Sequence, residues 1–416
     1  MGVAGLGQGA AGMIPSMHAM PEIELVAGAD LNPAMREGFA DRFPGTRVYA
    51  TVAELCADPA VEAVYVGTPN RFHCEHALEA MRHGKHAIVE KPMAITLEEA
   101  DAMVAASEKF GVKLLAAHTR SYGVWTRAMR RLVISGAVGP LRAIHVWAYT
   151  DWMLRPRTAD ELDPSQGGGI VFRQGPHQID TIRLIGGGRL RSVRAMTGQW
   201  MSERPVPGYY CAFFEFEDGT PATIMHNGYG YYSMNELYPW VVTKRGYTDE
   251  DRAVLRRALR DGGRDEEKEK QDYRVGGRHD PTAAAKTSSG PQEWSPFDLG
   301  PVELTCERGF VRNDRRGLVV YDDAGRHDVD LLHLQRPEPD PSGGLSIAVL
   351  EELHAAVVRG RPVYHDGAWG RATLEAALAV MQSARERREI ALHRQVAMPA
   401  DYDADLPIDA QTLVRR

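Results

Sequence analysis

The sequence predicts an α/β protein whose N-terminal part forms a doubly wound parallel sheet. Two observations predict this sheet: a glycine-rich run follows the first short apolar segment, and strands then alternate with helices up to about residue 118. Further along the chain, strands that alternate apolar and polar residues predict an antiparallel sheet. We therefore expect a nucleotide-binding domain at 1–118, an α+β domain at 119–398 and a tail at 399–416.

The glycine-rich run at 2–12 fits a dinucleotide-binding turn, although such a run can also be an ordinary turn. It contains the spacing Gly5-x-Gly7-x-x-Ala10. The first glycine permits a tight turn, the second lets the backbone approach a pyrophosphate, and the small third residue allows close helix packing. The phosphates would lie at the positive end of the helix. The candidate cofactor-binding residues here are Gly5, Gly7, Gln8, Gly9 and Ala10.

The second apolar segment, 23–29, predicts a strand that ends at Asp30. An acidic side chain at this place accepts hydrogen bonds from the adenosine ribose and repels a 2′-phosphate, so Asp30 predicts NAD rather than NADP. The alternative is an acidic residue at a strand end that faces water. Only four residues precede Gly5. The first strand is therefore unusually short, and the start of the natural chain stays open.

Three more strands, 61–67, 86–90 and 112–117, alternate with helices at 71–83 and 97–110. Ligands of such sheets bind at the carboxyl ends of the strands. The segments to consider for function are therefore the ones just past those ends: Thr68-Pro69-Asn70, Glu90-Lys91-Pro92 and His118-Thr119-Arg120.

The rest of the chain predicts further strands and two closing helices. The strands are expected at 141–149, 191–197, 209–216, 220–225, 302–306 and 318–321, with a hairpin turn at 217–219 and helices at 345–358 and 368–386. Between 244 and 290 lie 12 basic and 10 acidic residues. We expect one helix at 249–259 there and otherwise a mobile excursion or an oligomer arm. The tail after 399 is expected to be loosely packed.

The composition excludes several classes of function. Of the 416 residues, 44% are hydrophobic and 25% charged, as in a globular protein of more than one domain. The net charge of −7 argues against nucleic acid as the main partner. No stretch reaches the ~18–20 apolar residues of a membrane span, and the N-terminus lacks the features of a secretion signal. Four cysteines without a C-x-x-C pair argue against zinc and disulfide sites. We expect a soluble cytoplasmic protein without a metal.

Four segments together resemble the Gfo/Idh/MocA oxidoreductases. They are the glycine run, Thr68-Pro-Asn-Arg-Phe-His73, Glu90-Lys-Pro92 and the segment 167–180. The resemblance implies a Rossmann domain followed by an open, mostly antiparallel sheet that covers the nicotinamide. It also implies a cis Lys91-Pro92 bond and cofactor contacts by Thr68, Pro69, Asn70, His73, Glu90 and Lys91.

The resemblance further implies that Lys91 and His177 meet at a substrate hydroxyl. A base must remove the hydroxyl proton while a hydride leaves the carbinol carbon, and a histidine suits that step. A nearby ammonium stabilises the developing alkoxide. We therefore assign His177 as the general base and Lys91 as the electrostatic stabiliser and proton partner.

The chain departs from the family pattern at Arg173, where the family has an aspartate four residues before the histidine. A fixed cation beside a lysine favours an anion, and a substrate carboxylate fits an arginine fork. Arg120 is a second candidate for this contact, and Asp180, within the same signature, is a candidate substrate-binding residue. The alternative is that Arg173 pairs with an acidic residue of the protein, such as Asp151 or Glu215.

A narrower resemblance concerns the segments 228–237 and 365–375. They are similar to phthalate dihydrodiol or dihydroxyphthalate dehydrogenases, which oxidise carboxylated cis-dihydrodiols. The leading hypothesis is an NAD-dependent dehydrogenase of such a substrate, with a sugar or cyclitol dehydrogenase as the alternative. A non-catalytic NAD-binding regulator is the hypothesis of another class. We expect a homodimer or homotetramer formed through the C-terminal sheet.

Overall fold

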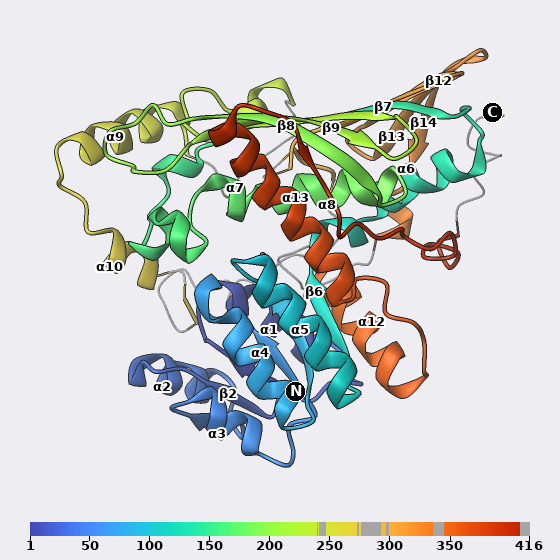
Figure 1. The fold of residues 1–416 in the computed structure, drawn as a ribbon. Coiled ribbons are helices and arrows are strands. Elements are labelled where there is room, and N and C mark those ends of the chain that lie inside the picture. Colours follow the sequence, from blue (N-terminus) through green and yellow to red (C-terminus); the bar gives the residue numbers. More distant parts are fainter. Residues whose placement is uncertain are drawn as a thin grey trace.

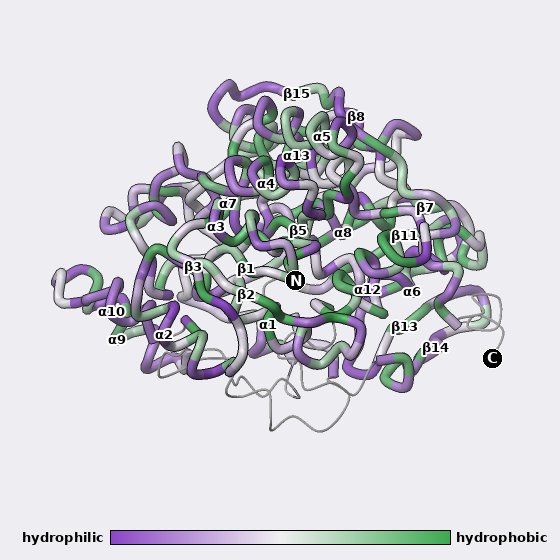
Figure 2. Tube along the Cα trace, turned by 90° about the horizontal axis from the view of Figure 1, so that it is seen from below, coloured by the Kyte–Doolittle hydropathy of each residue, from purple (hydrophilic) through white to green (hydrophobic). Residues whose placement is uncertain are grey.

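A computed structural model describes residues 1–238, 240, 247–272, 274–275, 293–296, 299–335 and 345–407. It contains two sheets, one above the other in Figure 1, with helices on the faces of the lower one. Figure 2 shows hydrophilic residues along the outer helices α2, α9 and α10. Within the described part of the chain, no helix has the length and apolar character needed to cross a membrane.

The first sheet has six parallel strands in the order β3-β2-β1-β4-β5-β6, which confirms the predicted doubly wound fold. The order reverses between β1 and β4, and ligands of such sheets bind at that point. The strands are β1 (Gly2–Ala4), β2 (Ala27–Ala29), β3 (Arg47–Tyr49), β4 (Ala63–Val66), β5 (His86–Glu90) and β6 (Leu114–Ala117). Strand β3 was not predicted, because two of its three residues are exposed and it lacks an apolar pattern.

Helices connect these strands, and local sequence signals explain their ends. Helix α5 begins with a capping box between Thr96 and Glu99, and it ends at Gly111, whose φ of +67° favours glycine. The helices of this part are α1 (Gln8–Ala19), α2 (Pro33–Arg42), α3 (Val52–Ala57), α4 (His73–Arg82) and α5 (Leu97–Phe110), with the short 3₁₀ helix η1 (Asn70–Phe72) before α4.

The second sheet has nine strands in the order β14-β13-β12-β11-β7-β10-β9-β8-β15. Only the pair β7 and β10 is parallel, so the predicted, mostly antiparallel sheet is confirmed. The strands are β7 (Leu141–Tyr149), β8 (Leu190–Gly198), β9 (Tyr209–Phe216), β10 (Pro221–Asn227), β11 (Val302–Cys306), β12 (Gly309–Asn313), β13 (Gly317–Asp322), β14 (Gly325–Asp330) and β15 (Ile390–Ala391).

Several helices lie between the two sheets or at their edges. Helix α8 packs on the inner face of the second sheet, where Gln178 donates to the carbonyl oxygens of Met225 and Leu299 and accepts from Tyr210. The helices here are α6 (Val124–Ser135), α7 (Ile170–Arg173) and α8 (Gly175–Ile185). The 3₁₀ helices are η2 (Thr119–Tyr122), η3 (Trp152–Leu154), η4 (Asp160–Leu162), η5 (Pro164–Gln166), η6 (Met234–Leu237) and η7 (Leu332–Leu334).

The two C-terminal helices, α12 (Leu345–Val358) and α13 (Gly367–Glu386), return to the first sheet. Helix α12 packs on α1, and α13 reaches from the second sheet to α5, as Figure 1 shows. A Cβ atom at Gly370 would lie 2.5 Å from Cβ of Ala116, so the glycine permits this close approach. Part of the range 119–398 therefore covers the nucleotide-binding domain.

The charged insert is more ordered than predicted. The expected helix is confirmed as α9 (Asp249–Arg260), and a second helix, α10 (Glu266–Gln271), follows it. The expectation of a mobile excursion, made for the insert outside the expected helix, is wrong for 260–272. Here Arg264 donates to the carbonyl oxygen of Leu154, and the buried Arg204 pairs with Glu266. The remaining insert residues, 244–246, 273 and 276–290, lie outside the described residues.

The tail also differs from the prediction, at least to residue 407. Asp403 is completely buried beside the buried guanidinium of Arg130, with 3.7 Å between the charged groups. Arg130 also donates to the carbonyl oxygen of Pro399 at 2.7 Å. Loose packing is therefore wrong for 399–407, because a buried arginine of α6 needs these acceptors. Residues 408–416 lie outside the description.

Candidate active site

The glycine loop lies between β1 and α1, where the strand order of the first sheet reverses. Gly5 has φ of +84°, and a Cβ atom there would lie 2.9 Å from the backbone of Thr68, so only glycine fits. A Cβ atom at Gly7 would meet nothing within 4 Å. Gly7 caps α1 without a side-chain hydrogen bond. The turn before α1 therefore has room for a ligand beside Gly7, as binding of a pyrophosphate requires.

Asp30 follows β2, and hydrogen bonds from the backbone hold its carboxylate. Oδ2 accepts from the amide of Leu6 in the glycine loop and Oδ1 from the amide of Asn32, both at 2.9 Å. The guanidinium of Arg36 donates to the carbonyl oxygens of Asp30 and Leu31. The acid is thus fixed beside the glycine loop, where it fits an adenosine ribose.

His73 joins the two predicted cofactor motifs. Its ring nitrogens lie 2.8 Å from the carbonyl oxygens of Thr68 and of Pro92. Burial lowers the pKa of His73, although these two carbonyls act in the opposite direction. Asn70 donates to the carbonyl oxygen of Gly167 at 2.7 Å. The structure therefore shows Asn70 and His73 holding loops in place at the edge of the site.

Glu90 and Lys91 lie at the carboxyl end of β5, and the Lys91-Pro92 bond is cis, as predicted. The carboxylate of Glu90 accepts from the buried hydroxyl of Tyr65 and from the amide of Lys91. Lys91 Nζ donates to the carbonyl oxygen of Arg173 in α7 at 3.1 Å. The predicted lysine therefore reaches from the first sheet to the middle of the second-domain signature.

His177 lies in the first turn of α8 and is 7% exposed. Among the described residues, its Nδ1 has no hydrogen-bond partner. The pKa of His177 lies well below its usual value, first because of burial and then because Lys91 and Arg120 are positively charged. A neutral imidazole near an ammonium group suits a general base. The structure therefore brings Lys91, Arg120 and His177 close to one another.

Arg173 pairs with an acid of the protein, but neither of the two acids that we named. Its Nη2 lies 2.8 Å from Oε1 of Glu161, whereas Asp151 pairs with Arg155 and Glu215 with Arg191. The Arg173 side chain remains 28% exposed. Burial lowers the pKa of Arg173, whereas the negative charges of Asp160 and Glu90 raise it. The sequence did not single out Glu161, because η4, which contains it, has no recognisable motif.

Asp180 lies three residues after His177 on α8, so the two share a face of the helix. It is completely buried, and its Oδ1 accepts from Trp369 Nε1 at 2.5 Å. Among the described residues its Oδ2 has no hydrogen-bond partner, and its charge acts on His118. The substrate contact of Asp180 stays a prediction.

His118 is a residue of the site that the prediction did not include, although the segment after β6 was singled out. It is 2% exposed, and neither ring nitrogen has a hydrogen-bond partner among the described residues. Burial lowers the pKa of His118 to about 4, and Asp180 acts in the opposite direction. The charge of His118 also lowers the pKa of His177, so the two groups belong to one electrostatic environment.

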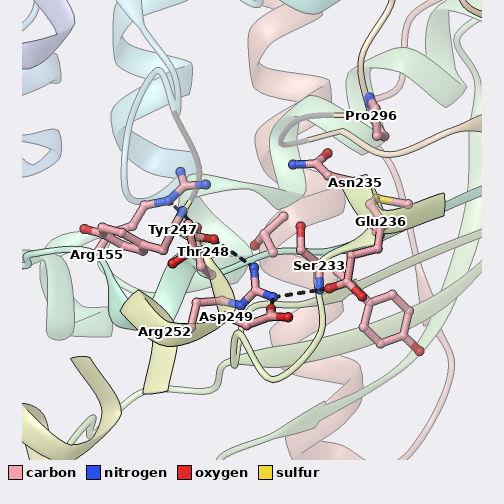
Figure 3. A pocket seen from close by; sticks show the side chains of 13 residues that line it. Arg155, Ser233, Asn235, Glu236, Tyr247, Thr248, Asp249, Arg252 and Pro296 are labelled. Atoms are coloured by element: carbon pink, nitrogen blue, oxygen red, sulfur yellow. Dashed lines mark hydrogen bonds and ion pairs between the residues drawn. The ribbon is translucent and has the colours of Figure 1, made fainter. Parts of the chain in front are cut away.

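A separate cavity of about 280 Å³ lies in the second domain, away from these residues. Its lining comes from the end of β7, from η6 and from the start of α9, and Figure 3 shows Arg252 directed at Glu236 within it. None of the predicted site residues lines it. Among the described residues, no group of three or more His, Cys, Asp or Glu side chains could hold a metal ion.

Comparisons with known proteins agree with this geometry. Residues 1–118 match the oxidoreductase family with an NAD-binding Rossmann fold, and residues 126–244 match the GFO/IDH/MocA C-terminal domain. A 1-carboxy-3-chloro-3,4-dihydroxycyclohexa-1,5-diene dehydrogenase from Comamonas testosteroni is 32% identical, over 92% of this chain and 94% of its own.

Two solved structures show the same fold. A protein from Bordetella bronchiseptica RB50, assigned as a dehydrogenase, has a TM-score of 0.82 and 34% identity, over 94% of this chain and 98% of its own. A levoglucosan dehydrogenase in complex with NADH and levoglucosan has a TM-score of 0.70 at 19% identity, with the same coverage of both chains. This chain therefore belongs to the Gfo/Idh/MocA family and is an NAD(P)-dependent oxidoreductase.

Proposed function

We propose that this protein is an NAD-dependent dehydrogenase of a small cyclic alcohol that carries a carboxylate, such as the cis-dihydrodiol of a phthalate-like acid. One observation carries the proposal: the charges of Lys91 and Arg120 act on a neutral His177, and a third cation, Arg173, follows on the neighbouring helix, where its backbone carbonyl binds Lys91. The relative from Comamonas testosteroni, whose name describes a carboxylated dihydroxycyclohexadiene, supports this substrate class.

The coenzyme site fits NAD. Gly5, Gly7, Gln8, Gly9 and Ala10 provide the phosphate-binding turn, and Asp30 accepts hydrogen bonds from the ribose. Thr68, Pro69 and Glu90 lie at the neighbouring strand ends. When bound there, the nicotinamide supplies the hydride acceptor.

His177 acts as the general base in this proposal. It takes the proton of the substrate hydroxyl as the carbinol C–H bond breaks and the C=O bond forms, and bound NAD would supply the acceptor of the hydride. Lys91 donates a hydrogen bond to the developing alkoxide, and its ammonium charge stabilises that oxygen. Its present bond to the carbonyl oxygen of Arg173 positions the amine beside α8.

Arg173 and Arg120 bind the substrate carboxylate in this proposal. Arg173 shares Glu161 with Arg157 and Lys270, so this single carboxylate faces three basic side chains. A bidentate arginine–carboxylate pair in a partly buried site gives strong orientation. Asp180 fixes α8 against α13 through Trp369, and its second oxygen is left for the substrate in this proposal.

The test is NAD reduction with matched substrates: the cis-dihydrodiols of phthalate and of benzene, and levoglucosan or inositol for the alternative of a sugar or cyclitol dehydrogenase. We expect turnover of the carboxylated diol, and Arg173→Ala should raise its KM by about 30-fold or more, the effect of losing a charge-assisted pair. Arg191→Ala, at an exposed ion pair, is the control. Efficient turnover of the uncharged sugars alone would overturn the substrate class, and NAD binding without any turnover would favour a regulator.

We also propose that the outer face of the second sheet joins subunits of a homodimer or homotetramer. Trp147, Met225, Cys211 and Met196 lie side by side in register across β7, β10, β9 and β8. Met196 is 66% exposed. An exposed row of apolar side chains is unusual on a protein surface unless it binds a partner. Met196→Glu should shift the mass measured by light scattering to that of a monomer.

The four cysteines are all unpaired, and three of them are buried. Free thiols of this kind suit a reducing compartment, and we propose the cytoplasm as the location.

A further inference from the structure

Helix α10 of the charged insert ends beside the predicted substrate arginine. Lys270 Nζ contacts Oε2 of Glu161, and Oε1 of the same carboxylate lies 2.8 Å from Arg173 Nη2. The side chains of Lys270 and Glu161 are 11% and 3% exposed, so water is largely excluded from their contact. Figure 1 shows α10 beside the green segment that contains η4.

The position of α10 is fixed by buried charged groups. Arg204, which is 1% exposed, donates to both carboxylate oxygens of Glu266 at the start of α10. Arg264, whose side chain is 5% exposed, donates to both oxygens of Glu269, with distances of 2.7 to 2.9 Å. Bidentate pairs of this kind hold a short helix in a single orientation. Lys270 is therefore presented to Glu161 by a rigid support.

The two oxygens of Glu161 serve different partners. Oε1 faces Arg173 and, at 3.6 Å, Arg157, whereas Oε2 faces Lys270 and accepts from the amide of Thr158 at 3.1 Å. The attraction between Glu161 and Arg173 is not changed by other cations, but a positive Lys270 on the other oxygen repels Arg173 and offsets part of that attraction. Lys270 therefore weakens the net hold on Arg173.

The other charges nearby include acids as well as bases. Burial first, and then the charge of Arg157, lower the pKa of Lys270 to about 7, whereas Asp160 raises it. Arg274 is paired with Glu267 at 3.4 Å. What singles out Glu161 is that three basic side chains share its one carboxylate, and Arg173, at 28% exposure, is the most exposed of the three.

We propose that Lys270 is a positioning residue for substrate specificity: by occupying Glu161, it keeps the guanidinium of Arg173 available to a substrate carboxylate. The inference rests on the proposed function, because it assumes that Arg173 binds this carboxylate. If Lys270 has this role, helix α10 is part of the substrate site. The family signature does not include this helix.

The test uses the full chain with Lys270→Met, Lys270→Arg and the control Lys268→Met. Lys268 is an exposed lysine of the same helix and contacts neither Glu161 nor Arg173 in the described structure. For each variant, kcat and KM are measured with the cis-dihydrodiols of phthalate and of benzene, and the Kd of NADH by fluorescence. Thermal unfolding followed by circular dichroism checks that each variant folds.

We expect Lys270→Met to raise the KM for the carboxylated diol on the order of tenfold, since a unit charge acting over roughly 10 Å has an effect of that size. The kcat, the KM for the uncharged diol and the Kd of NADH should change less than about twofold. Lys270→Arg keeps the positive charge, so its KM for the carboxylated diol should stay much closer to that of the unchanged protein. Lys268→Met should behave as the unchanged protein.

An equal rise in KM for both diols would indicate a merely structural role and would overturn the inference, as would an unchanged KM. Arg173→Ala separates this failure from that of the proposed function. If Arg173→Ala raises the KM for the acid and Lys270→Met does not, only the role of Lys270 is wrong. If Arg173→Ala has no effect either, the carboxylate contact itself is wrong. If Lys270→Met does not fold, Lys270→Gln replaces it. It is judged by the same quantity, the rise in KM for the carboxylated diol relative to the rise in KM for the uncharged diol.

Discussion

Asp30 makes the sharpest prediction about the coenzyme. Its carboxylate is held on both oxygens by backbone amides, so it cannot turn away from an arriving 2′-phosphate. Two unit charges about 4 Å apart repel by about 1 kcal/mol in water and about 4 kcal/mol at an effective dielectric constant of 20. The loss of the ribose hydrogen bond adds about 1.5 kcal/mol or more. These terms sum to about 2.5 to 5.5 kcal/mol, so the protein should bind NADH on the order of 100-fold to 10,000-fold more tightly than NADPH.

The perturbation is Asp30→Ser, which removes the charge and keeps a short hydrogen-bonding side chain. The Kd of NADH should rise about tenfold, and that of NADPH should fall at least about tenfold, because Arg36 stays nearby through its bonds to two carbonyl oxygens. Fluorescence titration measures both constants, and Glu37→Ser, at an exposed residue of α2, is the control. Equal affinities in the unchanged protein, or a ratio that Asp30→Ser leaves unaltered, would refute the reasoning.

Three further predictions concern pH and packing. Because the pKa of His177 is lowered, the acidic limb of the pH profile of kcat/KM should lie below 6.5, and a limb at or above 6.5 would contradict the assignment as a neutral base. The pKa of His118 is lowered to about 4, so the unfolded chain binds a proton at this residue before the folded protein does as the pH falls through 6.5. About 3 kcal/mol of unfolding free energy should therefore be lost by pH 4. In urea titrations, His118→Gln should flatten the dependence of the unfolding free energy on pH over this range. Asp403→Ala should lower the unfolding free energy, measured in urea titrations, by about 3 kcal/mol, because it leaves Arg130 buried without its carboxylate. A change below about 1 kcal/mol would show that the tail contributes little to stability.

Much of the fold follows from local patterns. The alternation of strands and helices up to residue 117 is visible in the sequence because each buried strand is a short apolar run. The ends of α5 are set by Thr96, Glu99 and Gly111. The sequence also indicates the site's lysine and histidine, because both lie in short motifs that the family resemblance identifies.

The rest depends on contacts between distant residues. Glu161, the partner of Arg173, is separated from Lys270 by 109 residues, and no sequence period connects them. Asp180 belongs to a signature, but only the packing of α13 against α8 shows that Trp369 occupies its carboxylate. The tail looks polar, yet Asp403 is buried because Arg130 lies beneath it.

The most direct test of the account is the rate of NADH formation at saturating NAD and carboxylated diol, compared for the unchanged protein, Lys91→Met and His177→Gln. Both changes should lower kcat by about 100-fold or more while the Kd of NADH stays within about threefold, because each side chain acts on the substrate hydroxyl. If either variant keeps a normal kcat, the amine and the imidazole do not perform the proton chemistry, and the central claim is contradicted.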